Sequence, residues 1–440
     1  MLSTEKIRKE VDRIEQGITD IALKGTAMIP REVDLPRLEA LARELFDISG
    51  GRNELRFNKK GQPSIMVNFP CDEKARLDYL SGSGSYFTVP SYGSGVPHRN
   101  IHPAFIVNGS PIKGFRLGKY KDVRVGSTNY HLSLYGLPPA YGSGGVTESY
   151  DGLASACDNL NAATDFSEGD RVANITYAIF RYLAMLSVTE GFHMRGADSY
   201  GKAHNATGEK GAPCGYNYNG QFIHVINGSG PNSWRHDGTP FGVYGLIGCT
   251  REICHGFELD AGKILLIPNN NALRATAAEL ANTSASFKAI ATDGSLVDRT
   301  TEEGVFYYDY NEDPGSSGSK SFKLTTSLTH QQENSNPYGS MSLSSIPVED
   351  GITVPMIMRL MGFYKLETGT PRGVVYMRND AGRKTCAWAG SFWFMSLVAG
   401  SPISMQVTIH SDMLITLVLG ASLQKWRNGK MEKSSKAAIY

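Results

Sequence analysis

The segment from residue 228 to residue 248 constrains the fold of this chain more than any other. It reads Gly-Ser-Gly-Pro-Asn-Ser-Trp-Arg-His-Asp-Gly-Thr-Pro-Phe-Gly-Val-Tyr-Gly-Leu-Ile-Gly. Its glycines can take positive φ, its prolines fix φ, and an Asp-Gly pair favours a tight turn, so the backbone should be irregular yet fully determined. Trp234 and Tyr244 can supply the buried aromatic anchors that such a loop needs. The segment therefore predicts a structural loop and not a catalytic one.

Further landmarks occur in a fixed order on both sides of this loop. They are His102–Gly109, Gly114-Phe115, Gly118-Lys119-Tyr120, Arg195-Gly196, Ile267–Asn270, Ala389–Phe392 and Ala399-Gly400. Together they resemble the formylglycine-generating-enzyme-like branch of the C-type-lectin fold over residues 98–423. The nearest likeness is to the phage and prophage proteins that are targets of diversity-generating retroelements. This resemblance implies an α+β, C-type-lectin-like domain with long loops that displays a variable ligand-binding surface.

The composition is that of a folded protein without a dominant charge. Of 440 residues, 41% are hydrophobic and 20% are charged, which is enough to build a large core and two domains. Lys and Arg number 44 against 43 Asp and Glu, so no global field would attract a nucleic acid or an anionic membrane. We therefore expect neither a nucleic-acid partner nor membrane insertion.

The first ten residues lack an apolar segment, and no stretch reaches the ~20 apolar residues of a membrane-spanning helix. We expect synthesis and folding in a host cytoplasm without a signal peptide, which fits a virion protein released by lysis. The six cysteines are scattered, so we expect them to be reduced and not to form a disulfide framework.

An N-terminal module is predicted over residues 1–95. Residues 3–24 should form a helix whose seam repeats with heptad spacing and is entirely β-branched: Ile7, Val11, Ile14, Ile18 and Ile21. Isoleucine at both seam positions favours three or four strands over two, so a coiled-coil homotrimer is one interpretation. The alternative is that this short helix packs on its own domain.

The rest of the chain divides as follows. A second helix should begin with Asp34 as its N-cap and end before Gly50-Gly51, and residues 52–96 should form a small β-rich region and a linker. The lectin-like domain is predicted over residues 96–425 and includes a helix from Asp170 to Glu190. Residues 426–440 form a basic C-terminal tail.

Enzymatic interpretations are not supported by the residues. The resemblance implies a close cysteine pair for an oxidase, yet only Cys386 lies in that region, and a thiol copper site needs two soft ligands. His98 and His102 have a spacing that could begin an iron site, but Ala104 stands where a further ligand is expected. Cys249–His255 suggests zinc, but no second ligand pair follows at a suitable distance. We expect no enzymatic activity, no metal and no cofactor.

The resemblance instead places the ligand-binding surface in residues 391–422, after the scaffold aromatic Phe392. The implied binding residues are Trp393, Phe394, Met395, Leu397, Val407, Thr408, Asp412, Leu414, Ile415 and Thr416. Aromatic, Met and Leu side chains are typical of protein-binding hot spots. Buried strands remain the alternative, and for Met413–Leu419 the two interpretations are equally open.

These observations predict a phage or prophage virion protein that binds a receptor. Its partners would be a host cell-surface protein or glycan and other virion proteins, and it would act as a homotrimer. The alternatives are a structural virion component, such as a baseplate or capsid-decoration protein, and an oxidase of the formylglycine-generating type.

Overall fold

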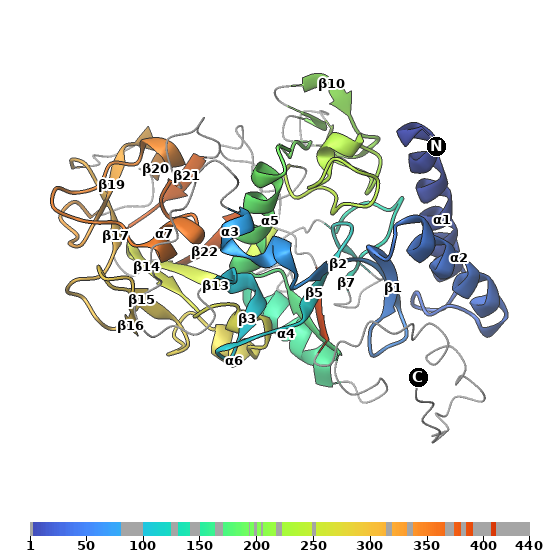
Figure 1. Cartoon of the computed structure of the whole chain (residues 1–440), viewed down its shortest axis with the longest axis horizontal. Coiled ribbons are helices and arrows are strands. Elements are labelled where there is room, and N and C mark those ends of the chain that lie inside the picture. Colours follow the sequence, from blue (N-terminus) through green and yellow to red (C-terminus); the bar gives the residue numbers. More distant parts are fainter. Residues whose placement is uncertain are drawn as a thin grey trace.

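The computed structural model shows a mixed α+β protein in which antiparallel sheets flank a central helix (Figure 1). It describes residues 3–80, 100–124, 131–140, 150–162, 170–192, 194–197, 200–203, 206–216, 222–248, 252–313, 319–331, 338–365, 374–379, 384–389 and 406–410.

A five-stranded antiparallel sheet joins segments that are far apart in the sequence. Its order is β1 (Asn53–Phe57), β2 (Pro63–Pro70), β5 (Gly114–Gly118), β23 (Gln406–His410) and β8 (Asp170–Asn174). Val67 pairs with Leu117, and Leu117 also pairs with Val407. The sheet therefore crosses the boundary predicted near residue 96, and residues 53–70 share a core with residues 114–118.

A second, seven-stranded sheet lies at the other end of the molecule (Figure 1). Its main path runs through β16 (Leu296–Asp298), β15 (Lys288–Ile290), β14 (Lys263–Leu266), β13 (Glu252–Asp260) and β22 (Lys384–Ala389), and β14 also pairs with β17 (Tyr307–Tyr310), which pairs with β19 (Phe322–Thr325). Beside it is a three-stranded sheet of β18 (Ser319–Lys320), β20 (Tyr338–Ser342) and β21 (Val374–Met377).

Four two-stranded ribbons complete the strands of the described residues. They are β3 (Ile106–Val107) with β4 (Ser110–Pro111), β6 (Val123–Arg124) with β7 (His131–Leu132), β9 (Lys202–Ala203) with β10 (Ala206–Lys210), and β11 (Pro213–Tyr216) with β12 (Phe222–Val225).

The described residues also form α-helices and short 3-10 turns. They are α1 (Thr4–Lys24), α2 (Leu35–Ile48), α3 (Leu77–Leu80), α4 (Tyr150–Ala162), α5 (Tyr177–Thr189), α6 (Ala277–Leu280) and α7 (Met356–Leu360), with short 3-10 turns at Glu32–Asp34, Glu73–Ala75, Pro103–Phe105, Asn232–Trp234, Asn271–Leu273 and Leu343–Ser345. Among the described residues, no helix is both long and apolar enough to cross a membrane.

The central helix α5 corrects one prediction. Residues 170–174, expected to be its first turns, form strand β8, and the helix begins only after Thr176. The Thr176 side chain accepts a hydrogen bond from the Ile179 amide, which is an N-cap contact. Gly191, with a φ of 71°, follows the helix end as expected. Pairing of β8 with the distant β23 outweighs the local helical pattern.

The two N-terminal helices form as predicted, with Ser3 capping α1 and Asp34 at the N-cap of α2. The seam of α1, however, is buried inside the chain: Val11, Ile14, Ile18 and Ile21 are at most 1% exposed. They share a hydrophobic cluster with Leu38 of α2 and with Trp234 and Tyr244. The coiled-coil interpretation of this seam is therefore wrong, and packing on its own domain is correct.

Candidate functional site

The loop of residues 228–248 is a rigid structural centre, as the sequence predicted. Trp234 and Tyr244 are each 1% exposed, and the Tyr244 hydroxyl accepts a hydrogen bond from the Gly230 amide at 3.0 Å. A Cβ atom at Gly230 would lie 2.0 Å from the Trp234 ring, so only glycine fits there. Gly228 and Gly238 have φ of 82° and 67°, values that favour glycine. Steric fit thus determines the path of this loop.

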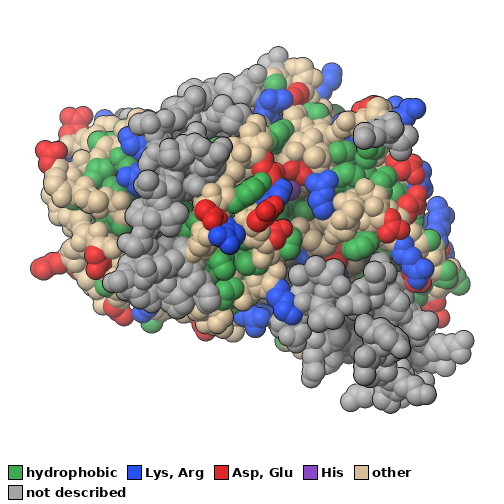
Figure 2. Space-filling model, viewed as in Figure 1, with side chains coloured by type: hydrophobic (Ala, Val, Ile, Leu, Met, Phe, Trp, Pro, Cys, Tyr) green, Lys and Arg blue, Asp and Glu red, His purple; other side chains and the backbone are tan. Residues whose placement is uncertain are grey.

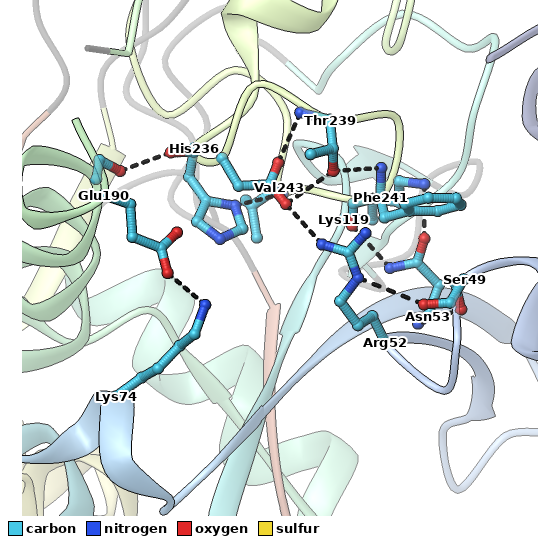
Figure 3. Close-up of polar contacts among 12 residues, drawn as sticks. Ser49, Arg52, Asn53, Lys74, Lys119, Glu190, His236, Thr239, Phe241 and Val243 are labelled. Carbon is cyan, nitrogen blue, oxygen red and sulfur yellow. Dashed lines mark hydrogen bonds and ion pairs between the residues drawn. The ribbon is translucent and has the colours of Figure 1, made fainter. Parts of the chain in front are cut away.

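Polar contacts hold the tip of the loop in place (Figure 3). The Val243 amide donates to His236 Nδ1 at 2.9 Å, and the His236 amide donates to the Val243 carbonyl at 3.0 Å. Burial lowers the pKa of His236, so the ring remains neutral and acts as an acceptor. Asp237 accepts hydrogen bonds from both the amide and the hydroxyl of Thr239.

The loop tip is tied to the start of β1 by an arginine. Arg52 Nη1 lies 3.0 Å from Asp237 Oδ2, and its guanidinium lies 4.7 Å from the centre of the Phe241 ring. The next residue, Asn53, donates from Nδ2 to the Phe241 carbonyl at 2.8 Å. The neighbouring residues Arg52 and Asn53 therefore contact both ends of the segment from Asp237 to Phe241 (Figure 3).

Below this contact lies a fully buried polar cluster. Lys119 Nζ, just after β5, donates to Asn53 Oδ1 at 2.9 Å and to Glu15 Oε1 of α1 at 2.6 Å. The Tyr120 hydroxyl donates to the other Glu15 oxygen. Burial lowers the pKa of Lys119 to about 8 and raises the pKa of Tyr120 well above its ordinary value. The cluster thus links α1, β1 and β5 in a place without access to water.

One face of the molecule carries both signs of charge. On the face shown in Figure 2, Lys and Arg side chains are interspersed with Asp and Glu side chains. Lys74 forms an ion pair with Glu190, and the Tyr79 hydroxyl also donates to Glu190 at 3.3 Å. Mixed charge of this kind favours neither polyanion nor polycation binding.

The predicted binding residues fall mostly outside the described residues: Trp393, Phe394, Met395, Leu397, Asp412, Leu414, Ile415 and Thr416. Val407 and Thr408 lie in β23, where their backbones pair with Leu117 and Arg116 of β5 on one side and with Ala173 and Val172 of β8 on the other. The structure therefore places these two positions inside a sheet between two neighbouring strands.

The candidate metal ligands adopt structural roles where they are described. His102 is fully buried and accepts from the Ala104 amide at 3.1 Å, and burial lowers its pKa to about 3. His255 Nε2 lies 3.2 Å from the Tyr150 carbonyl oxygen, and burial lowers its pKa to about 4. Their proposed neighbours, His98 and Cys249, lie outside the described residues. Within the described ranges, no group of three or more His, Cys, Asp or Glu side chains is arranged to hold a metal ion.

Sequence reasoning missed the buried cluster of Glu15, Asn53 and Lys119. Lys119 belonged to one of the ordered landmarks, but nothing local assigned it a partner. The available signal was the position of Glu15 directly after the seam residue Ile14, since a carboxylate beside a buried seam needs a partner. Its neighbours become visible only once α1 is placed against β1 and β5.

Comparison with known proteins adds no identification. The chain matches no protein-family model and no curated protein.

Proposed function

We propose that this protein is a receptor-binding component of a phage or prophage virion, built on a C-type-lectin-like scaffold. Residues 391–422 would carry the binding surface, with Trp393 and Phe394 as its main contacts. The proposal rests on the sequence resemblance and on two structural observations, which concern how this segment is anchored and how the loop of residues 228–248 is packed.

Two sheets anchor the segment. Strand β22 ends at Ala389 in the seven-stranded sheet, and β23 covers Gln406–His410 in the five-stranded sheet. Residues 390–405 therefore join two sheets that are each fixed by pairing, β22 to β13 and β23 to both β5 and β8. A connection between rigid elements is a common position for binding residues, because the scaffold limits the entropy lost on binding.

The packed loop of residues 228–248 supports the same proposal. Its glycines, its pair of buried aromatic side chains and its internal hydrogen bonds hold it in place. This arrangement suits a scaffold that keeps its shape while a different segment varies in sequence.

The mechanism in this proposal is adhesion without chemistry. Each site would make modest contacts with a host cell-surface protein or glycan, and many copies on one particle would bind strongly because later contacts become intramolecular. A homotrimer remains part of the proposal. Its interface would have to use a surface other than the α1 seam, which is buried within the chain.

The test is binding of labelled protein to cells of the presumed host. The double variant Trp393→Ala, Phe394→Ala should lose saturable binding. The variant Tyr200→Ala, which removes an aromatic side chain that is 36% exposed elsewhere, should bind as the unaltered protein does. Absence of binding by the folded, unaltered protein would refute the proposal and favour a structural virion component. Equal loss in both variants would refute the role given to residues 393 and 394.

A further inference from the structure

Three side chains with complementary reactivity meet in the buried cluster beneath the loop tip. Glu15 comes from α1, Asn53 is the first residue of β1, and Lys119 follows the last residue of β5. All three residues are 0% exposed. Lys119 Nζ lies 2.9 Å from Asn53 Oδ1 and 2.6 Å from Glu15 Oε1, so one amine touches both a carboxamide and a carboxylate.

The surrounding contacts fix the orientation of the carboxamide. Asn53 Nδ2 donates to the Phe241 carbonyl at 2.8 Å, and the Asn53 amide donates to Ser49 Oγ at 2.9 Å. The side-chain oxygen is therefore directed to Lys119, and this hydrogen bond holds Nζ against the carboxamide whose carbonyl carbon is Cγ. Figure 3 shows Asn53 below Phe241, whose carbonyl accepts from Asn53 Nδ2.

The carboxylate is oriented as well. Glu15 Oε2 accepts from the Tyr120 hydroxyl, which leaves Oε1 for Lys119. Ile14, Ile18 and Tyr244 belong to the same hydrophobic cluster as Tyr120, and the charges of Arg235 and Asp12 also act on Lys119. Water is excluded, so hydrolysis does not compete at the carbonyl carbon, and a fixed contact between reactants gives a large rate advantage over a bimolecular reaction.

We propose that Lys119 and Asn53 form an intramolecular isopeptide bond, with Glu15 as the group that transfers protons. Glu15 takes a proton from the Lys119 ammonium, and the neutral amine attacks Asn53 Cγ. A C–N bond forms between Nζ and Cγ, and the bond from Cγ to Nδ2 breaks. Nδ2 leaves as ammonia with one of the remaining amine protons, relayed by Glu15, and Glu15 ends as a neutral carboxylic acid. No oxidant, cofactor or second substrate is needed.

The electrostatics of the cluster favour this reaction. Burial lowers the pKa of Lys119 to about 8, and the nearby charge of Arg235 acts in the same direction, so the neutral amine is more accessible than in water. The reaction also replaces a buried ion pair, whose desolvation is costly, by a neutral amide and a neutral acid.

The bond would change the connectivity of the scaffold. It would join the start of β1 to the end of β5, the two neighbours of β2 in the five-stranded sheet. This inference does not depend on the proposed function, because it requires only the folded chain.

Mass spectrometry of the purified full chain tests the proposal. The intact protein should be lighter than its sequence by one ammonia. Trypsin cuts after Arg52, Arg56, Arg116 and Lys121 but not after an acylated lysine, so digestion should yield one branched peptide of residues 53–56 and 117–121. An intact mass equal to the sequence mass, with free peptides 53–56 and 117–119, would overturn the proposal. Loss of ammonia without the branched peptide would overturn it too.

Three variants separate the roles. Glu15→Gln keeps the size of the side chain but cannot accept a proton, so this variant should keep its ammonia. Lys119→Met should also keep it. Asn53→Asp should lose water instead and reach the same final mass as the unaltered protein, because both reactions give one product. Circular dichroism of each variant establishes that it is folded, and a branched peptide from folded Glu15→Gln would refute the role of Glu15.

Discussion

Truncation of Ile18 to alanine should destabilise the protein strongly, because α1 packs on its own domain. Ile18 is 0% exposed and lies in the cluster that includes Leu38, Leu41 and Trp234. Removing three carbons at about 0.8 kcal/mol each costs about 2.4 kcal/mol in transfer free energy. The cavity left behind brings the expected cost to about 2–5 kcal/mol.

Leu23→Ala is the matched control on the same helix. Leu23 is 51% exposed and the truncation again removes three carbons, so we expect a change of less than about 1 kcal/mol in the free energy of unfolding. Urea denaturation, followed by circular dichroism at two protein concentrations, measures both variants. Helix α1 should not make the urea midpoint depend on protein concentration, because its apolar seam is buried within one chain.

Two results would refute this reasoning. An equal cost for Ile18→Ala and Leu23→Ala would show that burial on the domain does not stabilise α1. A midpoint that rises with protein concentration in the unaltered chain but not in Ile18→Ala would show that the seam serves a coiled coil between chains after all.

Two further predictions concern the loop and a buried histidine. Gly230→Ala should destabilise the protein by about 1–3 kcal/mol, because the new Cβ atom would meet the Trp234 ring. In the control variant Gly208→Ala the Cβ atom meets nothing within 4 Å, so the loss of stability should be smaller. Thermal unfolding compares the two variants, and equal losses would refute the steric argument. Burial lowers the pKa of His255 from 6.5 to about 4, so the unfolded chain binds a proton first and stability should fall by about 3 kcal/mol as the pH drops through that range. The slope of unfolding free energy against pH should be smaller in His255→Gln, and an unchanged slope would contradict this assignment.

The buried face of α1 shows how far local pattern reaches. The spacing of Val11, Ile14, Ile18 and Ile21 correctly predicted a helix and the side that would be buried. It did not distinguish a coiled coil from packing on the same chain, because a short heptad repeat is also an amphipathic helix. Only the position of α2 and of the Trp234 loop decided what covers this side.

Residues 170–174 show the opposite outcome. Val172 and Ile175 continue the helical spacing of α5, so the sequence favoured one longer helix. The structure forms β8 there because β23, more than two hundred residues later, supplies hydrogen-bonding partners for it. Pairing between distant strands leaves no local signal, and tertiary contact outweighs a weak helical preference.

The sequence by itself determined much of the loop around Trp234, because proline fixes φ, glycine can take positive φ, and the Trp234 ring leaves no room for a Cβ atom at Gly230. It also determined the near-neutral charge and the helical N-terminus. Only the tertiary structure decided that Lys119 forms buried hydrogen bonds with both Glu15 and Asn53, since each comes from a different part of the fold and none is near the others in sequence. Burial then changes their chemistry, because a lysine without water loses the solvation that keeps it charged.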